Sequence, residues 1–131
     1  MTTHRELGVL PKLISLPREP IAAKWEVEEN KQAGTLRALL RFSAADYDHI
    51  VRESETFDRR GNEILDASMF EWIDAEAIRG VESKRDGSSV ELLDVEPRRA
   101  NLFSRAELSP YVNGKITPLA DGFVLVAMYA M

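Results

Sequence analysis

The hydrophobic and polar positions of this chain follow two different periods, and the change between them predicts the fold. Residues 22–29 read AAKWEVEE, in which apolar Trp25 and Val27 alternate with charged neighbours. Residues 35–42 read TLRALLRF, and every second side chain from Leu36 onwards is apolar. Successive side chains of a strand point to opposite faces, so both segments are predicted as strands with one packed face.

The segment between these strands has the composition of a turn. Residues 30–34 read NKQAG, which predicts an antiparallel hairpin. Glu26 and Glu28 would then face Arg37 and Arg41 across the pair. Such pairs fix the register of a hairpin more than they add stability.

Helical spacing begins directly after the second strand. Ser43 is a favourable N-cap residue, and the apolar positions that follow predict a helix over 44–54. Residues 65–79 repeat apolar side chains at the same spacing and predict a second helix that stops before Gly80. Asp74 is a position at which this second segment can divide into two short helices.

The next part of the chain predicts shorter elements. Residues 89–95 have the composition of a strand, and residues 97–108 can hold a short helix. The dipeptide NG at 113–114 is the strongest turn signal in the chain. It is expected to join a short strand near Tyr111 to another near Ile116.

The chain closes on GFVLVAMYAM, residues 122–131, in which both alternating faces are apolar. A strand with one face in water cannot be built in this way. The run is therefore predicted as a central strand, covered on both faces. The alternative is an exposed edge or the seam of a dimer, because an uncovered apolar strand invites pairing.

Together these patterns predict an α+β fold. The expected antiparallel sheet has about four to five strands, among them segments 22–29, 35–42, 89–95 and 122–130, with two to three helices packed mainly on one face. The chain, 131 residues long, is expected to form a single domain. Residues 1–20 contain three prolines and are predicted as an extended leader over the surface.

Composition and charge narrow the classes of function. The chain has no cysteine, which excludes disulfides, thiolate nucleophiles and cysteine zinc sites. Its formal net charge of −5 repels phosphate backbones, so nucleic acid is not an expected partner and a basic protein is. The N-terminal segment lacks the unbroken apolar run of a signal peptide, and the closing run is roughly half the length of a membrane helix. A cytoplasmic protein without a membrane anchor is expected, as a monomer or a homodimer.

Catalytic chemistry has little support in the sequence. The two histidines are His4 and His49, and Asp46 lies one helical turn before the second. Two ligands on one helix do not complete a metal site, and no serine-nucleophile, phosphate-loop or dinucleotide motif is present. No catalytic residue, metal or cofactor is therefore predicted, and a non-catalytic role is favoured over an enzymatic one.

Two hypotheses of different classes remain open. The first is a small acidic interaction protein, such as an inhibitor, immunity-type or adaptor domain, that binds another protein. Its candidate contact residues are the acids around the first helix and one tyrosine in the predicted turn: Asp46, Asp48, Glu53, Glu55, Asp58 and Tyr111.

The second hypothesis is a small-molecule-binding or enzymatic α+β domain with a pocket between sheet and helices. The candidate lining residues are Tyr47, His49, Phe70 and Trp72. A cavity with convergent polar groups would favour this hypothesis, whereas a solid core would favour the first.

Overall fold

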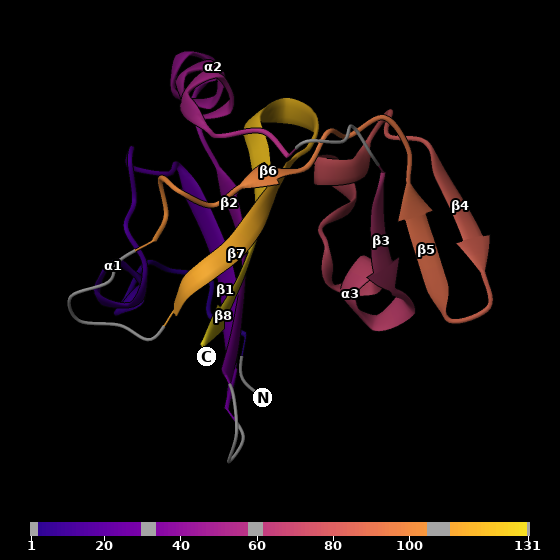
Figure 1. The fold of residues 1–131 in the computed structure, drawn as a ribbon, viewed down its shortest axis with the longest axis horizontal. Coiled ribbons are helices and arrows are strands. Elements are labelled where there is room, and N and C mark those ends of the chain that lie inside the picture. Colours follow the sequence, from indigo (N-terminus) through magenta and orange to yellow (C-terminus); the bar gives the residue numbers. More distant parts are fainter. Residues whose placement is uncertain (1–2, 30–33, 58–61, 105–110, 131) are drawn as a thin grey trace.

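The computed structural model describes residues 3–29, 34–57, 62–104 and 111–130. Within these residues the chain forms a five-stranded sheet and a separate three-stranded sheet, both antiparallel, together with three α-helices (Figure 1). The predicted α+β class is confirmed. The second sheet was not predicted.

The five-stranded sheet, called the main sheet below, has the strand order β1-β2-β8-β7-β6. Its strands are β1 (Ala22–Glu29), β2 (Gly34–Arg41), β8 (Phe123–Ala130), β7 (Tyr111–Pro118) and β6 (Arg98–Arg99). The strands predicted at 22–29, 35–42 and 122–130 are confirmed to within one residue. Glu26 lies opposite Arg37, as predicted, but Glu28 lies opposite Thr35 instead of an arginine.

Strand β8 is central, with β2 on one side and β7 on the other. Val124, Val126 and Met128 lie in one hydrophobic core, here the first core. Phe123 and Leu125 lie in another, the second core, on the opposite face. The prediction that both faces of this strand are covered is confirmed, and the edge alternative is wrong.

Both faces of the main sheet carry a covering layer, because both faces of β8 are apolar. The N-terminal segment with α1 (Leu10–Leu13) covers the first core, and Leu10 and Ile14 are buried there. The small sheet, with order β3-β5-β4, covers the second core together with α3 (Figure 1). The strands of the small sheet are β3 (Glu63–Asp66), β5 (Ser89–Leu92) and β4 (Ser83–Asp86). The same layer contains α3 (Ala67–Trp72) and the 3-10 helix η1 (Ala75–Ile78).

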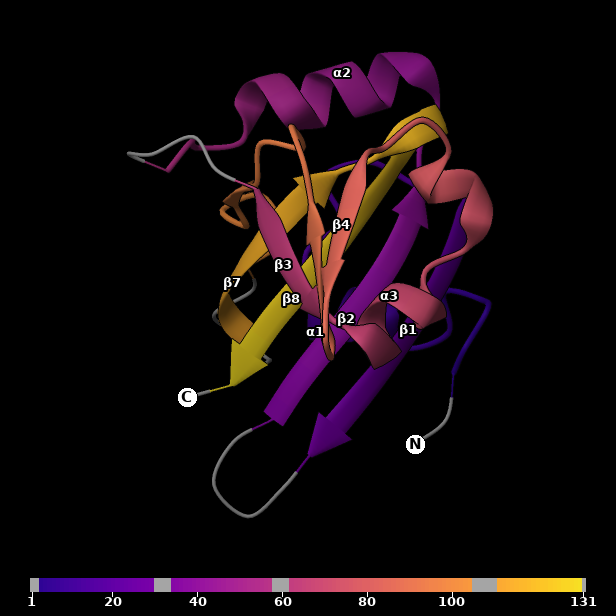
Figure 2. The same ribbon diagram turned by 90° about the vertical axis from the view of Figure 1, so that its right-hand side faces the viewer.

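Two predictions about these layers need correction. The helices do not gather on one face: α1 and α3 lie on opposite sides of the main sheet, and α2 (Ala44–Glu53) runs across one of its ends (Figure 2). The N-terminal segment is also not wholly extended, because it contains α1 and contributes buried side chains to the first core.

The predicted helix over 65–79 is wrong at its start. Glu63–Asp66 pairs with β5 as a strand, and Asp66 then caps α3 by accepting a hydrogen bond from the Met69 amide at 2.7 Å. The predicted division at Asp74 is confirmed, because α3 ends before Ile73 and Asp74 is the N-cap of η1. The strand predicted at 89–95 ends at Leu92 and belongs to the small sheet.

The predictions for the following segment are also wrong. Residues 98–99 form β6 and residues 101–103 a turn, in place of a helix; residues 105–108 lie outside the described part. The NG dipeptide at 113–114 does not turn the chain, since β7 continues through it with a register shift. A Cβ on Gly114 would lie 2.2 Å from the carbonyl oxygen of Ala127, so glycine allows the close approach of β7 to β8. The reversal occurs instead at η2 (Ala120–Gly122).

Candidate functional site

The acids predicted to contact a partner do not form one acidic face in the structure. Asp46 and Glu53 are seven residues apart and share a side of α2, whereas Asp48 lies on another. Arg18 lies 3.6 Å from the Asp46 carboxylate, and Arg52 lies 3.8 Å from the Glu53 carboxylate. Glu55 follows α2 and is exposed. Asp58 lies outside the described residues, and Tyr111 begins β7 rather than occupying a turn.

The four residues predicted to line a ligand pocket are divided between two helices. Tyr47 and His49 lie on α2, and the Tyr47 hydroxyl donates a hydrogen bond to the Leu119 carbonyl oxygen at 2.9 Å. Burial raises the pKa of Tyr47. Phe70 and Trp72 lie on α3 and pack against the second core. The structure does not bring these four side chains into one pocket.

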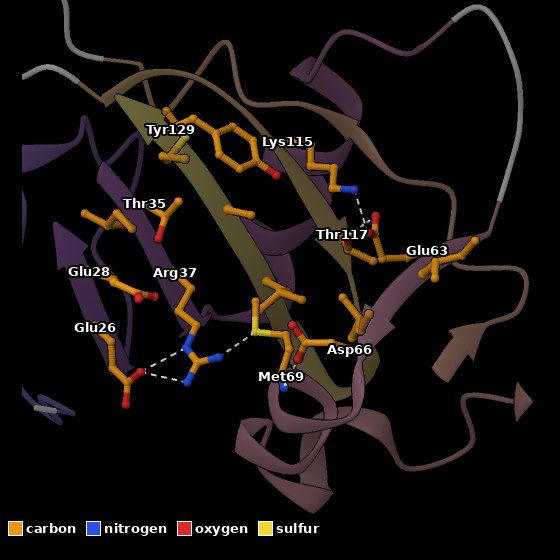
Figure 3. Close-up of a pocket in the computed structure, with 16 residues that line it drawn as sticks. Glu26, Glu28, Thr35, Arg37, Glu63, Asp66, Met69, Lys115, Thr117 and Tyr129 are labelled. Atoms are coloured by element: carbon orange, nitrogen blue, oxygen red, sulfur yellow. Dashed lines mark hydrogen bonds and ion pairs between the residues drawn. The ribbon is translucent and has the colours of Figure 1, made fainter. Parts of the chain in front are cut away.

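A groove of about 310 Å³ lies between the β3–α3 segment and the face of the main sheet that this segment covers (Figure 3). This volume is at the lower end of the range for small-ligand sites. Six charged residues line it: Glu26, Glu28, Arg37, Glu63, Asp66 and Lys115. We call it the charged groove.

Strand register creates the space at the centre of the charged groove. Glu26, Arg37, Ala127 and Lys115 are cross-strand neighbours in one row over β1, β2, β8 and β7. Because the side chain of Ala127 is only a methyl group, it leaves space between the longer side chains of Arg37 and Lys115. The floor of the groove is therefore apolar, and its charged groups stand on the walls (Figure 3).

Glu26 forms the most extensive hydrogen-bond network of one wall. Its Oε2 accepts hydrogen bonds from Arg37 Nε at 3.0 Å and Nη2 at 2.7 Å. Its Oε1 accepts from Trp72 Nε1 at 3.0 Å and from the Thr3 hydroxyl. Burial acts to raise the pKa of Glu26, but these hydrogen bonds and the nearby guanidinium outweigh it, so the pKa lies below its ordinary value. Glu26 is therefore a charged and fully engaged group.

Glu63 lies on the opposite wall of the groove, in β3, which is an edge strand of the small sheet. It is only 3% exposed, and its carboxylate accepts hydrogen bonds from Lys115 Nζ at 2.6 Å and from Thr117 Oγ1 at 3.4 Å. These contacts tie β3 to β7, that is, the small sheet to the main sheet. A buried carboxylate needs such partners, because an unpaired charge in an apolar setting is costly.

Two carboxylates of the charged groove, Glu28 and Asp66, form no ion pair within the described residues. Glu28 is exposed and makes no hydrogen bond or ion pair there. Asp66 is exposed; its Oδ1 accepts from the Ser68 hydroxyl and the Met69 amide, and the charge of Arg37 also acts on its carboxylate. These hydrogen bonds lower the pKa of Asp66, so it is negatively charged near neutral pH. Tyr129, which is 42% exposed, lies across the groove from them (Figure 3).

Sequence reasoning recognised one wall of this site and missed the other. The pair Glu26–Arg37 follows from the hairpin register. Glu63 was missed because residues 65–79 were predicted as a helix, which left no strand at 63–66 to carry it. In residues 63–66 the buried Glu63 and Leu65 alternate with exposed residues, which is the pattern of a strand. Four residues are too few for this pattern to distinguish a strand from a helix. Lys115 was placed beyond a turn that does not exist.

Comparisons with protein-family models, with curated proteins and with solved structures found no match. No helix in the described ranges combines the length and the apolar character needed to cross a bilayer. Over the same ranges, no three His, Asp or Glu side chains gather in a geometry that can hold a metal ion. The geometry of the charged groove is therefore the ground for a functional proposal.

Proposed function

We propose that the chain is a non-catalytic binding protein whose charged groove takes an organic cation. The cation is either a free small molecule or the side chain of a lysine or arginine of a partner protein. One observation carries the proposal. The groove contains four carboxylates and two cations, both cations form ion pairs, and two of the carboxylates form none with the described part of the chain.

The remaining chemistry of the groove suits such a ligand. Met69 and the methyl group of Ala127, both half-buried, provide apolar surface for an aliphatic stem, as the methylene groups of lysine require. Tyr129 adds an aromatic ring to the groove lining, across the groove from these carboxylates, and aromatic faces attract cations. An anionic ligand would meet the surplus negative charge.

Both earlier hypotheses contribute to this proposal. A basic protein partner remains one source of the cation, in line with the net charge of −5. The proposed contact with the partner lies in the groove and not on α2. Asp46 and Glu53 of α2 each lie beside an arginine, whereas two carboxylates of the groove form no ion pair with the described residues.

The test uses matched pairs of probes in calorimetric or NMR titrations at low salt. The free-molecule pair is n-pentylamine and pentanoate, which differ in the sign of the charge. The protein-side-chain pair is a capped Gly-Lys-Gly peptide and its norleucine counterpart. We expect the amine or the lysine peptide to bind, pentanoate and the norleucine peptide not to bind, and the binding to weaken as salt rises.

Two variants locate the binding. Glu28→Gln removes one unpaired carboxylate and is expected to weaken the cationic probe two- to fivefold, roughly the effect of a partly exposed ion pair. Glu71→Gln, on an exposed position of α3 outside the groove, is the matched control and is expected to change nothing. The proposal fails if neither cationic probe binds, or if pentanoate binds as well as the amine.

A further inference from the structure

A short segment near the N-terminus pairs with the outer edge of the main sheet. We call residues 3–6, which read THRE, the strap. His4 and Trp25 of β1 exchange two backbone hydrogen bonds of 2.8 Å, so the strap lies antiparallel to β1 at this point. Because β1 is the edge strand of the main sheet, the strap occupies the position that a further strand would take.

One face of the strap contacts Trp25. The His4 ring stacks on the Trp25 indole, with a distance of 4.2 Å between the ring centroids and an angle of 23° between the planes. Trp25 Nε1 also donates a hydrogen bond to the carbonyl oxygen of Glu6 at 2.8 Å. Trp25 is only 3% exposed under these contacts. The strap therefore contacts both the backbone and the side chain of this residue.

The other face of the strap contacts the covering layer and one wall of the charged groove. The Thr3 hydroxyl donates a hydrogen bond to the Glu26 carboxylate and accepts one from Trp72 Nε1 at 3.3 Å. Arg5 lies 3.9 Å from the Asp74 carboxylate. Main-chain pairing combined with alternating side-chain contacts is the way in which proteins recognise a peptide that adds a strand to a sheet edge.

The strap is held less firmly than the segment that follows it. All four of its residues are exposed, whereas Leu10 and Ile14 are fully buried in the first core. Gly8 lies between the two parts with a φ of 48°, and glycine accepts large changes of backbone angle. Local opening needs little free energy where few apolar side chains are buried. The strap can therefore open while the buried anchor stays in place, which frees the outward N–H and C=O of Trp25.

We propose that the outer edge of β1 is a binding site for an extended peptide of a partner protein, and that the strap occupies this site as a displaceable internal ligand. The contacts of the strap define the chemistry of the partner. It carries a planar ring opposite Trp25 and, at the next residue, a basic side chain directed to Asp74. The inference goes beyond the proposed function, because this site is the edge of β1 and needs no cation in the charged groove.

The test measures the binding of a labelled peptide by fluorescence anisotropy. The probe is the capped peptide Thr-His-Arg-Glu-Leu, which has the sequence of residues 3–7. The acceptor is the full chain with the strap loosened by Thr3→Gly, His4→Gly and Arg5→Gly, so that the buried anchor is unchanged. We expect the peptide to bind this loosened chain at least about tenfold tighter than the parent, because in the parent the strap competes at the high effective concentration of a short linker.

Altered peptides show whether binding adds a strand. N-methylation of the histidine amide removes the hydrogen bond to the Trp25 carbonyl oxygen but keeps every side chain, and we expect binding to fall at least about fivefold. Replacing the peptide arginine by glutamine should weaken binding about two- to threefold, the effect of an exposed ion pair. This last difference should disappear when the loosened chain also carries Asp74→Asn, whereas the control Glu71→Gln should keep it.

Hydrogen exchange in the parent chain gives a measurement that needs no variant. The Trp25 amide donates to the strap, so it should exchange through local opening, faster than the amides of β2, which is paired on both sides. Equal protection of the two would overturn the proposal.

Four binding outcomes also overturn it. The first two are a folded loosened chain that does not bind the peptide, and an N-methylated peptide that binds as well as the unmodified one. The third is a loosened chain that does not fold, because a displaceable strap is dispensable for folding. The fourth is a dimer of the parent chain that the peptide dissociates, which would assign the edge of β1 to a second copy of the chain.

Discussion

Two adjacent residues of β8 allow the central position of this strand to be tested directly. Leu125 is 2% exposed and lies in the second core, whereas Val126 is fully buried in the first core. Replacing a buried leucine by alanine costs about 2–5 kcal/mol of unfolding free energy. Replacing a buried valine removes two methyl groups and costs about 2 kcal/mol, from roughly 0.8 kcal/mol per group and a cavity term. Leu125→Ala and Val126→Ala are therefore each expected to lose at least about 2 kcal/mol.

Urea denaturation followed by circular dichroism measures these losses as shifts of the midpoint at constant slope. Val9→Ala and Ile64→Ala serve as controls, because these side chains are 52% and 63% exposed. Each control should stay within about 0.5 kcal/mol of the parent. The reasoning is refuted if one of the two β8 variants behaves like the controls. That result would mean that one face of β8 is in contact with water.

Two further predictions concern the close approach of β7 to β8 and the network around Glu26. Gly114→Ala should lose about 3 kcal/mol or more of unfolding free energy in urea, the upper end of overpacking costs, because its Cβ would lie 2.2 Å from the Ala127 carbonyl oxygen. Gly80→Ala, whose Cβ meets nothing within 4 Å, should lose only about 1 kcal/mol, from its positive φ; equal losses would contradict the steric argument. The pKa of Glu26 is lowered from 4.5, so its stabilisation is present above that value and declines as the pH falls through the folded-state pKa. Urea midpoints measured over this window should fall less steeply in Glu26→Gln than in the parent, and identical slopes would contradict the assignment.

The sequence by itself determined the elements whose hydrophobic period is long enough to be unambiguous. Strands β1, β2 and β8 each extend over eight residues, and the clear alternation in β1 and β2 and the apolar character of both faces of β8 identified them. Ser43, as a favourable N-cap residue, identified the start of α2, and its hydroxyl accepts a hydrogen bond from the Asp46 amide at 3.3 Å. The hairpin then predicted the pair Glu26–Arg37, which is half of the charged groove.

Tertiary structure alone decided the small sheet and the other half of the groove. Strands β3 and β4 have four residues each, and a run of that length carries too few alternations to distinguish a strand from a helical turn. Strand β5 was predicted from the sequence, but as part of the main sheet. The pairing of β3 with β5 is fixed instead by burial of Leu65 and Leu92 against the second core, and the fully exposed β4 pairs with the other edge of β5. The contact of Glu63 with Lys115 joins residues 52 positions apart, and no local pattern encodes such a contact. It exists because β8 needs cover on both faces, and the layer that supplies this cover carries Glu63 to the main sheet.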